Sequence, residues 1–274
     1  MSNLSLTEML TYSTVLIQCQ YRDGTQGSGT GFIINLCQDQ ASNQCVPVIV
    51  TNKHVIENSD LTEFEFCKRN ADGTPNDRET VLSVCSNQFW IMHPSPNVDL
   101  CCLPLVPVIN NARSNGEEIF YIPIGTELIP PQNEIEDLSA MEDVVMIGYP
   151  IGLSDRYNHK PIMRKGVTAT HIKKDYQGEK TFLVDMACFP GSSGSPIFIL
   201  NQGAYPTPEG LCAGNRIYFV GILYAGPQYS ASGILQFASL PNLPRPLTQI
   251  PTNLGIAIKS SELYAFEQMF KNAN

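Results

Sequence analysis

Apolar runs of strand length recur along the whole chain, and polar segments rich in turn residues separate them. Runs of this length, continuous or alternating every second residue, predict β-strands rather than helices. We place these strands at residues 13–20, 31–36, 47–51, 98–105, 144–149, 182–185, 196–200, 218–225 and 254–258. The pattern therefore predicts an all-β protein.

The strand pattern is interrupted at residues 119–141, where two prolines and an acidic stretch occur. We expect a β-barrel on each side: residues 1–125 form the first, and residues 126–274 hold a linker, the second barrel and a terminal helix. The helix begins after the cap candidate Ser260, and Leu263, Phe266 and Phe270 share one face. We expect this helix to pack on the second barrel.

Composition narrows the function. Seventeen Lys and Arg against 26 Asp and Glu give a net charge of −9, and no dense basic patch is present, which argues against nucleic acid as a partner. The first residues lack a secretory signal pattern, and no run approaches the roughly 18 apolar residues of a membrane span. We therefore expect a cytoplasmic protein that does not bind membranes.

The chain contains nine cysteines, an odd number, and their spacing does not match a zinc site. Most are expected to be small core residues with free thiols. Cys37 and Cys45 could bridge a hairpin, and the sequence leaves that question open. Neither a metal nor an organic cofactor is predicted.

The segment that carries chemistry runs from Phe189 to Pro196 and reads Phe-Pro-Gly-Ser-Ser-Gly-Ser-Pro. A serine hydroxyl attacks a carbonyl only if the resulting oxyanion is stabilised. Glycine two positions before Ser193 lets the backbone turn, so that the N–H groups of Gly191 and Ser193 converge on that oxygen. We assign the oxyanion hole to residues Gly191, Ser192 and Ser193. By itself, this segment could equally be a surface turn of small residues.

A nucleophilic serine needs a base, and His54 follows directly on an apolar strand. An imidazole also needs an acid that orients it, and Asp99 precedes an apolar run. Each residue alone has an ordinary structural explanation. The order His54, Asp99, Ser193 is hard to reach by accident.

Together these segments resemble the trypsin-like, chymotrypsin-fold serine proteases, and most closely the bacterial HtrA/Deg-like branch. The matching segments are Gly27-Ser-Gly-Thr-Gly-Phe, Thr51-Asn-Lys-His-Val, Val98-Asp-Leu, Val144-Val-Met-Ile-Gly-Tyr-Pro-Ile-Gly-Leu, Gly166-Val-Thr, the serine segment, Phe219-Val-Gly-Ile-Leu-Tyr and Gly255-Ile-Ala-Ile. The resemblance covers about residues 12–260, and the PDZ domain of most HtrA proteins has no counterpart. It implies two perpendicular antiparallel six-stranded β-barrels with a cleft between them.

By this resemblance Ser193 is the nucleophile, His54 the general base and then acid, and Asp99 the residue that fixes the imidazole tautomer. Substrate would lie extended along Tyr224, Ala225 and Gly226. The implied activity is hydrolysis of peptide bonds through an acyl-enzyme, with polypeptide as substrate and a protein activator or inhibitor as a possible partner.

The base of the specificity pocket is inferred by counting back six residues from Ser193. Ala187 falls at its base and Ile256 near its wall, so we expect a small or medium apolar side chain before the scissile bond. Asp185 is more consistent with a structural role than with selection of basic side chains. Residues 226–251 form a long loop that we expect at the rim of the cleft.

Two other classes of function remain as alternatives. The chain could be a latent or inactive member of this fold that binds peptides or regulates a partner. An α/β-hydrolase is disfavoured, because those enzymes place serine before histidine and need glycine at position 195, where this chain has Ser195.

Overall fold

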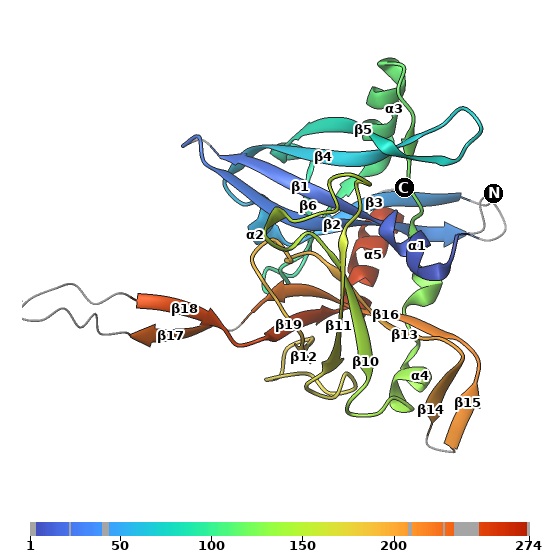
Figure 1. Ribbon diagram of the computed structural model, residues 1–274, viewed down its shortest axis with the longest axis vertical. Helices are drawn as coiled ribbons and strands as arrows, with labels where there is room; N and C mark the ends of the chain where they lie inside the picture. The colour runs from blue at the N-terminus through green and yellow to red at the C-terminus, as the bar shows by residue number, and fades with distance from the viewer. Residues whose placement is uncertain are drawn as a thin grey trace, which may run out of the picture.

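The computed structural model describes residues 4–21, 23–39, 44–207, 210–226, 228–232 and 247–272. Most regular structure in this part of the chain is β-strand, which confirms the predicted all-β class (Figure 1). Two assemblies of strands follow one another along the chain, and a helix closes it. No helix among these residues is long and apolar enough to cross a membrane.

The first half forms a nine-stranded sheet within the described residues, whose main path runs β5-β4-β1-β2-β3-β7-β6, while β8 pairs with β4 and β9 with β2. Its strands are β1 (Thr14–Tyr21), β2 (Gln26–Asp39), β3 (Gln44–Thr51), β4 (Ser59–Arg69), β5 (Pro75–Ser86), β6 (Ile91–Met92), β7 (Cys101–Pro104), β8 (Ile119–Phe120) and β9 (Ile124–Gly125). The helices inserted in or preceding this sheet are α1 (Leu6–Thr11), α2 (Lys53–Ile56), α3 (Leu105–Ser114) and the 3₁₀ turn η1 (Asn87–Phe89).

The second half contains a closed barrel of six strands in the order β10-β11-β12-β19-β16-β13. These strands are β10 (Asp143–Gly148), β11 (Ile162–Thr168), β12 (Thr181–Asp185), β13 (Pro196–Asn201), β16 (Arg216–Ala225) and β19 (Leu254–Lys259). Strands β10 and β11 run across the direction of the first sheet's strands in Figure 1. The six-stranded barrel agrees with the prediction, whereas the first half has more strands than the six expected.

The remaining elements connect or decorate the barrel. Two hairpins project from it, β14 (Ala204–Thr207) with β15 (Gly210–Ala213), and β17 (Gln228–Ser232) with β18 (Leu247–Pro251). The other elements are η2 (Thr126–Leu128), α4 (Gln132–Glu136), η3 (Pro150–Gly152), η4 (Ser260–Leu263) and α5 (Tyr264–Asn272). The hairpin β17–β18 extends away from the barrel (Figure 1), and residues 233–246 of the predicted rim loop lie outside the described part.

The strands that sequence analysis located carry the cores, and the ones it missed are more polar. β4 and β5 bury only alternate residues, such as Phe64 and Phe66, and were not predicted. α3 was also missed. It begins directly after β7, carries Pro107 in its first turn, where a missing N–H costs nothing, and buries Leu105, Val108 and Ala112.

The position of the terminal helix corrects a prediction. α5 packs on β2 of the first sheet, whereas the preceding turn η4 packs on β16, so the expected packing on the second barrel holds only for the start of this segment. Phe266 is fully buried with Phe32 and Ile34. The Glu267 carboxylate accepts a hydrogen bond from the Cys37 backbone N–H at 2.8 Å. The amphipathic pattern of α5 specifies an apolar face but not its partner, and Phe266 lies in one buried cluster with Phe32 of the first sheet and Phe219 of the barrel.

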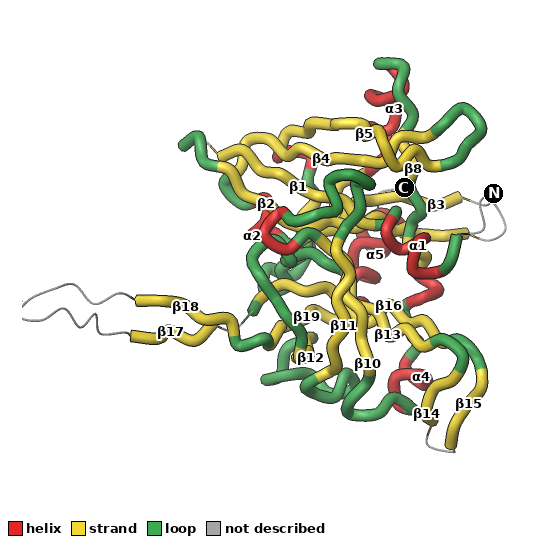
Figure 2. Tube along the Cα trace, viewed as in Figure 1, coloured by secondary structure: helices red, strands yellow, loops and turns green. Residues whose placement is uncertain are grey.

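The β10–β11 connection joins the two halves on the side where the candidate site lies. Figure 2 shows this loop reaching from the barrel to the first sheet. His159 of the loop contacts Glu65 of β4 at 2.8 Å, and the Lys160 ammonium contacts Asp77 of β5 at 2.5 Å. The seam between the halves is therefore fixed by side chains as well as by the cores.

Candidate active site

His54 and Asp99 meet at the edge of the first sheet. His54 lies in the short helix α2, which begins directly after β3. The Asp99 carboxylate binds this residue twice: Oδ2 lies 2.5 Å from Nδ1 of the imidazole, and Oδ1 accepts from the His54 backbone N–H at 3.1 Å. Two contacts on one carboxylate fix both the position of the ring and which ring nitrogen carries hydrogen. The Nε2 atom is left for a partner in the cleft.

Two neighbours of His54 hold the segment that carries Asp99. The Asn52 amide donates to the Asp99 carbonyl at 2.8 Å, and the Lys53 ammonium donates to the Ser95 carbonyl at 3.0 Å. Asn52 is fully buried. Three successive residues of one segment therefore bind the loop before β7, so the histidine and the acid are positioned as a unit.

The serine segment begins with a tight turn. The Ser192 N–H donates to the Phe189 carbonyl at 3.0 Å, with Pro190 and Gly191 at the corner. Gly191 has φ +86°, as the third residue of a type II turn requires. A Cβ at this position would lie 2.7 Å from the Tyr149 carbonyl oxygen and 2.9 Å from the Ile151 nitrogen. Position 191 therefore requires glycine, because its φ is positive and because a Cβ would have no space.

The carbonyl groups of this turn point away from the cleft. The Pro190 carbonyl accepts from the Ile151 N–H at 2.6 Å, and the Gly191 carbonyl accepts from the Thr30 hydroxyl at 2.9 Å. N–H and C=O point in opposite directions across a trans peptide, so the Gly191 N–H points away from residue 151. Within the described residues, the N–H groups of Gly191 and Ser193 have no hydrogen-bond partner.

Ser192 differs from its neighbours in the predicted oxyanion hole. Its N–H is engaged by the Phe189 carbonyl, and its side chain is fully buried. This residue therefore cannot donate to an oxyanion, and its assignment to the hole is corrected. Ser193, by contrast, is partly exposed. Of the two adjacent serines, only Ser193 presents a side chain to the cleft.

The backbone places Ser193 close to the segment of His54. The Ser193 carbonyl accepts from the Thr30 N–H at 2.9 Å. A Cβ on Gly194 would lie 1.9 Å from the Thr30 carbonyl oxygen and 2.5 Å from the Thr51 hydroxyl. Thr51 is only three residues before His54, so the serine loop packs directly against the end of β3.

A family comparison now decides what kind of protein this is. The model of the trypsin-like peptidase domain matches residues 29–204, more than half of the chain. The chain belongs to the trypsin-like peptidase family. A search of curated protein sequences gives no match.

Solved structures of similar proteins include several peptidases. The HtrA-type protease AlgW with a tripeptide is 14% identical with a TM-score of 0.46, over 96% of this chain and 60% of that one. The Rv3671c protease of M. tuberculosis in its active form is 15% identical with a TM-score of 0.44, and the match covers 93% of this chain and 79% of that one. The serine endoprotease from Yersinia pestis is 18% identical with a TM-score of 0.46, and the match covers 96% of this chain and 63% of that one. This trypsin-like peptidase thus spans about 60% of the length of the AlgW chain.

The predicted substrate residues of this trypsin-like peptidase come together around Cys188. Gly226 lies beside Cys188, at 3.6 Å between its ideal Cβ and that of the cysteine. Ala225 pairs with Ile256 across β16 and β19. The register of β16 shifts between residues 223 and 225, and such bulges re-aim side chains next to active sites. Tyr224 lies at this irregularity and is half-buried.

Sequence reasoning missed two residues beside the predicted pocket. Cys188 is buried, which raises the pKa of its thiol to about 11. The Arg164 guanidinium donates to the Ala187 carbonyl at 2.9 Å and lies 4.9 Å from the Phe189 ring centre. Arg164 lies in β11 just before the quoted Gly166-Val-Thr segment, and no sequence signal pointed to this contact.

The other histidines lie elsewhere. His93 is only 5% exposed, and its ring packs edge-on against Phe266 at 5.3 Å. His171 is half-buried, and burial lowers the pKa of its imidazole.

No group of three or more His, Cys, Asp or Glu residues in the described part of the chain could hold a metal ion. Each of the nine cysteines, all in described residues, is a free thiol, so Cys37 and Cys45 are not bridged.

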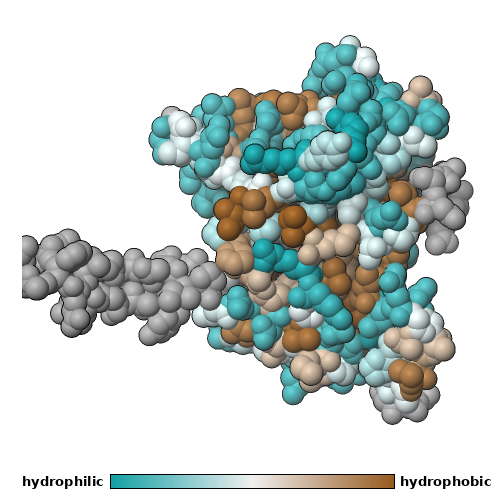
Figure 3. Space-filling view, in the orientation of Figure 1, coloured by the Kyte–Doolittle hydropathy of each residue, from teal (hydrophilic) through white to brown (hydrophobic). Residues whose placement is uncertain are grey.

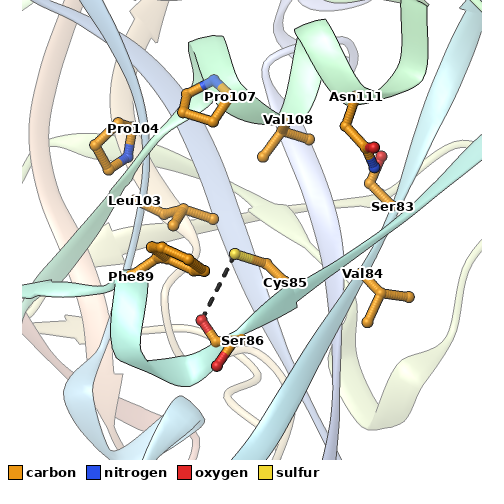
Figure 4. A pocket seen from close by; sticks show the side chains of 10 residues that line it. All are labelled: Ser83, Val84, Cys85, Ser86, Phe89, Leu103, Pro104, Pro107, Val108 and Asn111. Atoms are coloured by element: carbon orange, nitrogen blue, oxygen red, sulfur yellow. Dashed lines mark hydrogen bonds between the residues drawn. The ribbon is translucent and has the colours of Figure 1, made fainter. Parts of the chain in front are cut away.

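An apolar cavity of about 270 Å³ lies between β5 and α3 (Figure 4), and none of its lining residues belongs to the candidate site. Phe89, Leu103 and Val108 line it, and the Cys85 thiol on its floor donates to the Ser86 carbonyl at 3.6 Å. It contains no histidine or carboxylate. A hollow of about 470 Å³ next to Ile151 and Gly152 is nearer the serine loop and mostly polar, with Gln18, Gln20, Glu63 and Arg156 among its lining residues.

Proposed function

We propose that this protein is a serine endopeptidase that cleaves polypeptides through an acyl-enzyme. The observation that carries the proposal is the pair of contacts from Asp99 to His54, combined with the Gly191 and Ser193 N–H groups, which have no hydrogen-bond partner among the described residues. A base held in one tautomer and two donors without partners are the parts that acyl transfer requires.

In the proposed mechanism the Ser193 hydroxyl attacks the scissile carbonyl, and His54 Nε2 takes its proton. The Gly191 and Ser193 N–H groups stabilise the oxyanion of the tetrahedral intermediate. His54 then gives the proton to the leaving amine, and the C–N bond breaks. In the second half of the reaction His54 takes a proton from water, the water oxygen attacks the acyl carbonyl, and the Ser193 oxygen leaves with that proton. Asp99 stabilises the imidazolium in both halves.

Substrate binding follows from the strand that borders the serine loop. We propose that an extended peptide pairs with the backbone of residues 224–226, as in strand addition. Ala187 supplies no charge to the proposed pocket base, and the neighbouring Cys188 is buried in the apolar barrel core. A small or medium apolar side chain before the scissile bond is therefore the proposed preference. We further propose a cytoplasmic location and control by a protein partner.

The test is labelling with a fluorophosphonate probe, which reacts with activated serines. The intact protein should be labelled at Ser193, and mass spectrometry should locate the adduct there. Ser193→Ala should abolish labelling, and His54→Ala and Asp99→Asn should slow it by roughly 10³-fold or more, because each removes part of one triad.

Ser192→Ala is the matched control. Its hydroxyl is buried and has no hydrogen-bond partner among the described residues, so labelling should continue at the wild-type rate. A folded wild-type protein that takes up no probe would contradict the proposal and leave a peptide-binding module as the alternative.

A further inference from the structure

Thr30 occupies the centre of the seam between the two halves. It lies in β2 of the first sheet and is completely buried. Every polar atom of this residue is used. Its N–H donates to the Ser193 carbonyl at 2.9 Å, and its carbonyl accepts from the Thr51 hydroxyl at 2.8 Å.

The Thr30 hydroxyl makes two hydrogen bonds to segments of the second half of the chain. It donates to the Gly191 carbonyl at 2.9 Å and accepts from the Tyr149 N–H at 2.9 Å. Tyr149 begins the segment whose Ile151 N–H holds the Pro190 carbonyl. One hydroxyl of the first sheet therefore ties together the serine loop and the β10–β11 connection, both of which belong to the barrel.

The orientation of two peptide units depends on these contacts. A bond to the Pro190 carbonyl and a bond to the Gly191 carbonyl restrain the planes on both sides of Gly191. Glycine itself resists little, because positive and negative φ cost it about the same. Without anchors on its carbonyls, this residue could rotate and withdraw its N–H from the cleft.

We propose that Thr30 is a positioning residue that holds the Gly191 N–H in the oxyanion hole before any substrate binds. The inference rests on the proposed serine peptidase function. It also specifies that function, because a hole held from the first sheet needs no activator to form. The serine loop is then competent in the free protein.

The test compares Thr30→Val with Thr30→Ser. Valine keeps the shape but removes the hydroxyl, so the Gly191 carbonyl and the Tyr149 N–H lose their partner. The rate constant of fluorophosphonate labelling should fall by about 10-fold or more, toward the roughly 10²–10³-fold cost of losing one oxyanion donor. Serine retains the hydroxyl, so Thr30→Ser should restore most of the rate.

The pH dependence of labelling separates positioning from general damage. Since His54 and Asp99 do not contact the Thr30 side chain, the pH of half-maximal labelling should stay the same in Thr30→Val while the plateau falls. Equal plateaus for Thr30→Val and wild type would overturn the inference. So would a shifted midpoint, because the loss would then lie in the triad.

A second measurement covers the case in which Thr30→Val does not fold. Crystal structures of the wild-type protein, free and phosphonylated at Ser193, should both keep the Thr30 hydroxyl on the Gly191 carbonyl. A rotated Gly191 peptide in the free protein would overturn the inference. Absence of any labelling in the wild type would instead be a failure of the proposed function, so the two failures can be told apart.

Discussion

Gly148 and Ser195 share one small volume in the seam. An ideal Cβ on Gly148 would lie 2.0 Å from the Ser195 hydroxyl oxygen and 2.7 Å from the Thr30 hydroxyl. The missing side chain of residue 148 provides the space that the Ser195 side chain occupies. The serine at position 195 is thus accommodated by a residue 47 positions earlier in the chain.

This pair predicts a coupled effect of two substitutions. Gly148→Ala should lower the free energy of unfolding by about 1–3 kcal/mol, because the new methyl group overpacks a buried seam. Ser195→Gly in the same chain should recover part of that loss. Urea unfolding of the two single variants and the double variant measures the coupling, and strictly additive values would contradict this explanation.

At the scale of elements, α5 is the helix that ties the second half back to the first. Phe266 is fully buried, Glu267 binds the backbone of β2, and the His93 ring packs on Phe266. The His93 Nε2 also lies 3.2 Å from the Glu262 carbonyl in η4. These contacts all reach residues of the first sheet or its loops.

The contribution of α5 can be measured with Phe266→Ala. Removing a buried aromatic ring should cost about 3–5 kcal/mol of unfolding free energy. Tyr264→Ala, on the same helix but 41% exposed, is the control and should cost much less. Similar losses for both variants would show that α5 is stabilised by its own propensity and not by this contact.

The elements also show what a sequence can reveal. Continuous apolar runs located β3, β10, β13, β16 and β19 to within a few residues, because these strands are buried. The alternation around Phe64 was a readable signal for β4 that was not used. Spacing and resemblance singled out His54 and Asp99, which the structure brings together. The roles of Thr30 and Arg164 depend on contacts across more than 20 residues of sequence, and no local pattern encodes them.

At the scale of the molecule, buried thiols are spread through both halves. Burial raises the pKa of Cys19 and Cys188 to about 11 and that of Cys102 to about 12, from an ordinary value near 9. Cys101 is shifted in the same direction by burial. Hydrophilic and apolar patches are interspersed over the face in Figure 3.

These shifts predict loss of stability at alkaline pH. The folded state holds the thiol protons more tightly than the unfolded state, so this contribution is complete below about pH 9 and falls as the pH rises toward 11 to 12. Each thiol should contribute a slope of up to about 1.4 kcal/mol per pH unit. Urea unfolding between pH 8 and 11 measures it, and Cys102→Ala should show a shallower slope. A pH-independent stability above pH 9 would contradict the prediction.

The return of α5 to the first sheet has a consequence for how the protein is made. During synthesis, residues 14–125 leave the ribosome long before residues 196–272, yet the apolar face of β2 packs on Phe219 of the barrel as well as on Phe266 of α5. The sheet that holds His54 therefore cannot complete its core until the barrel that holds Ser193 has also emerged.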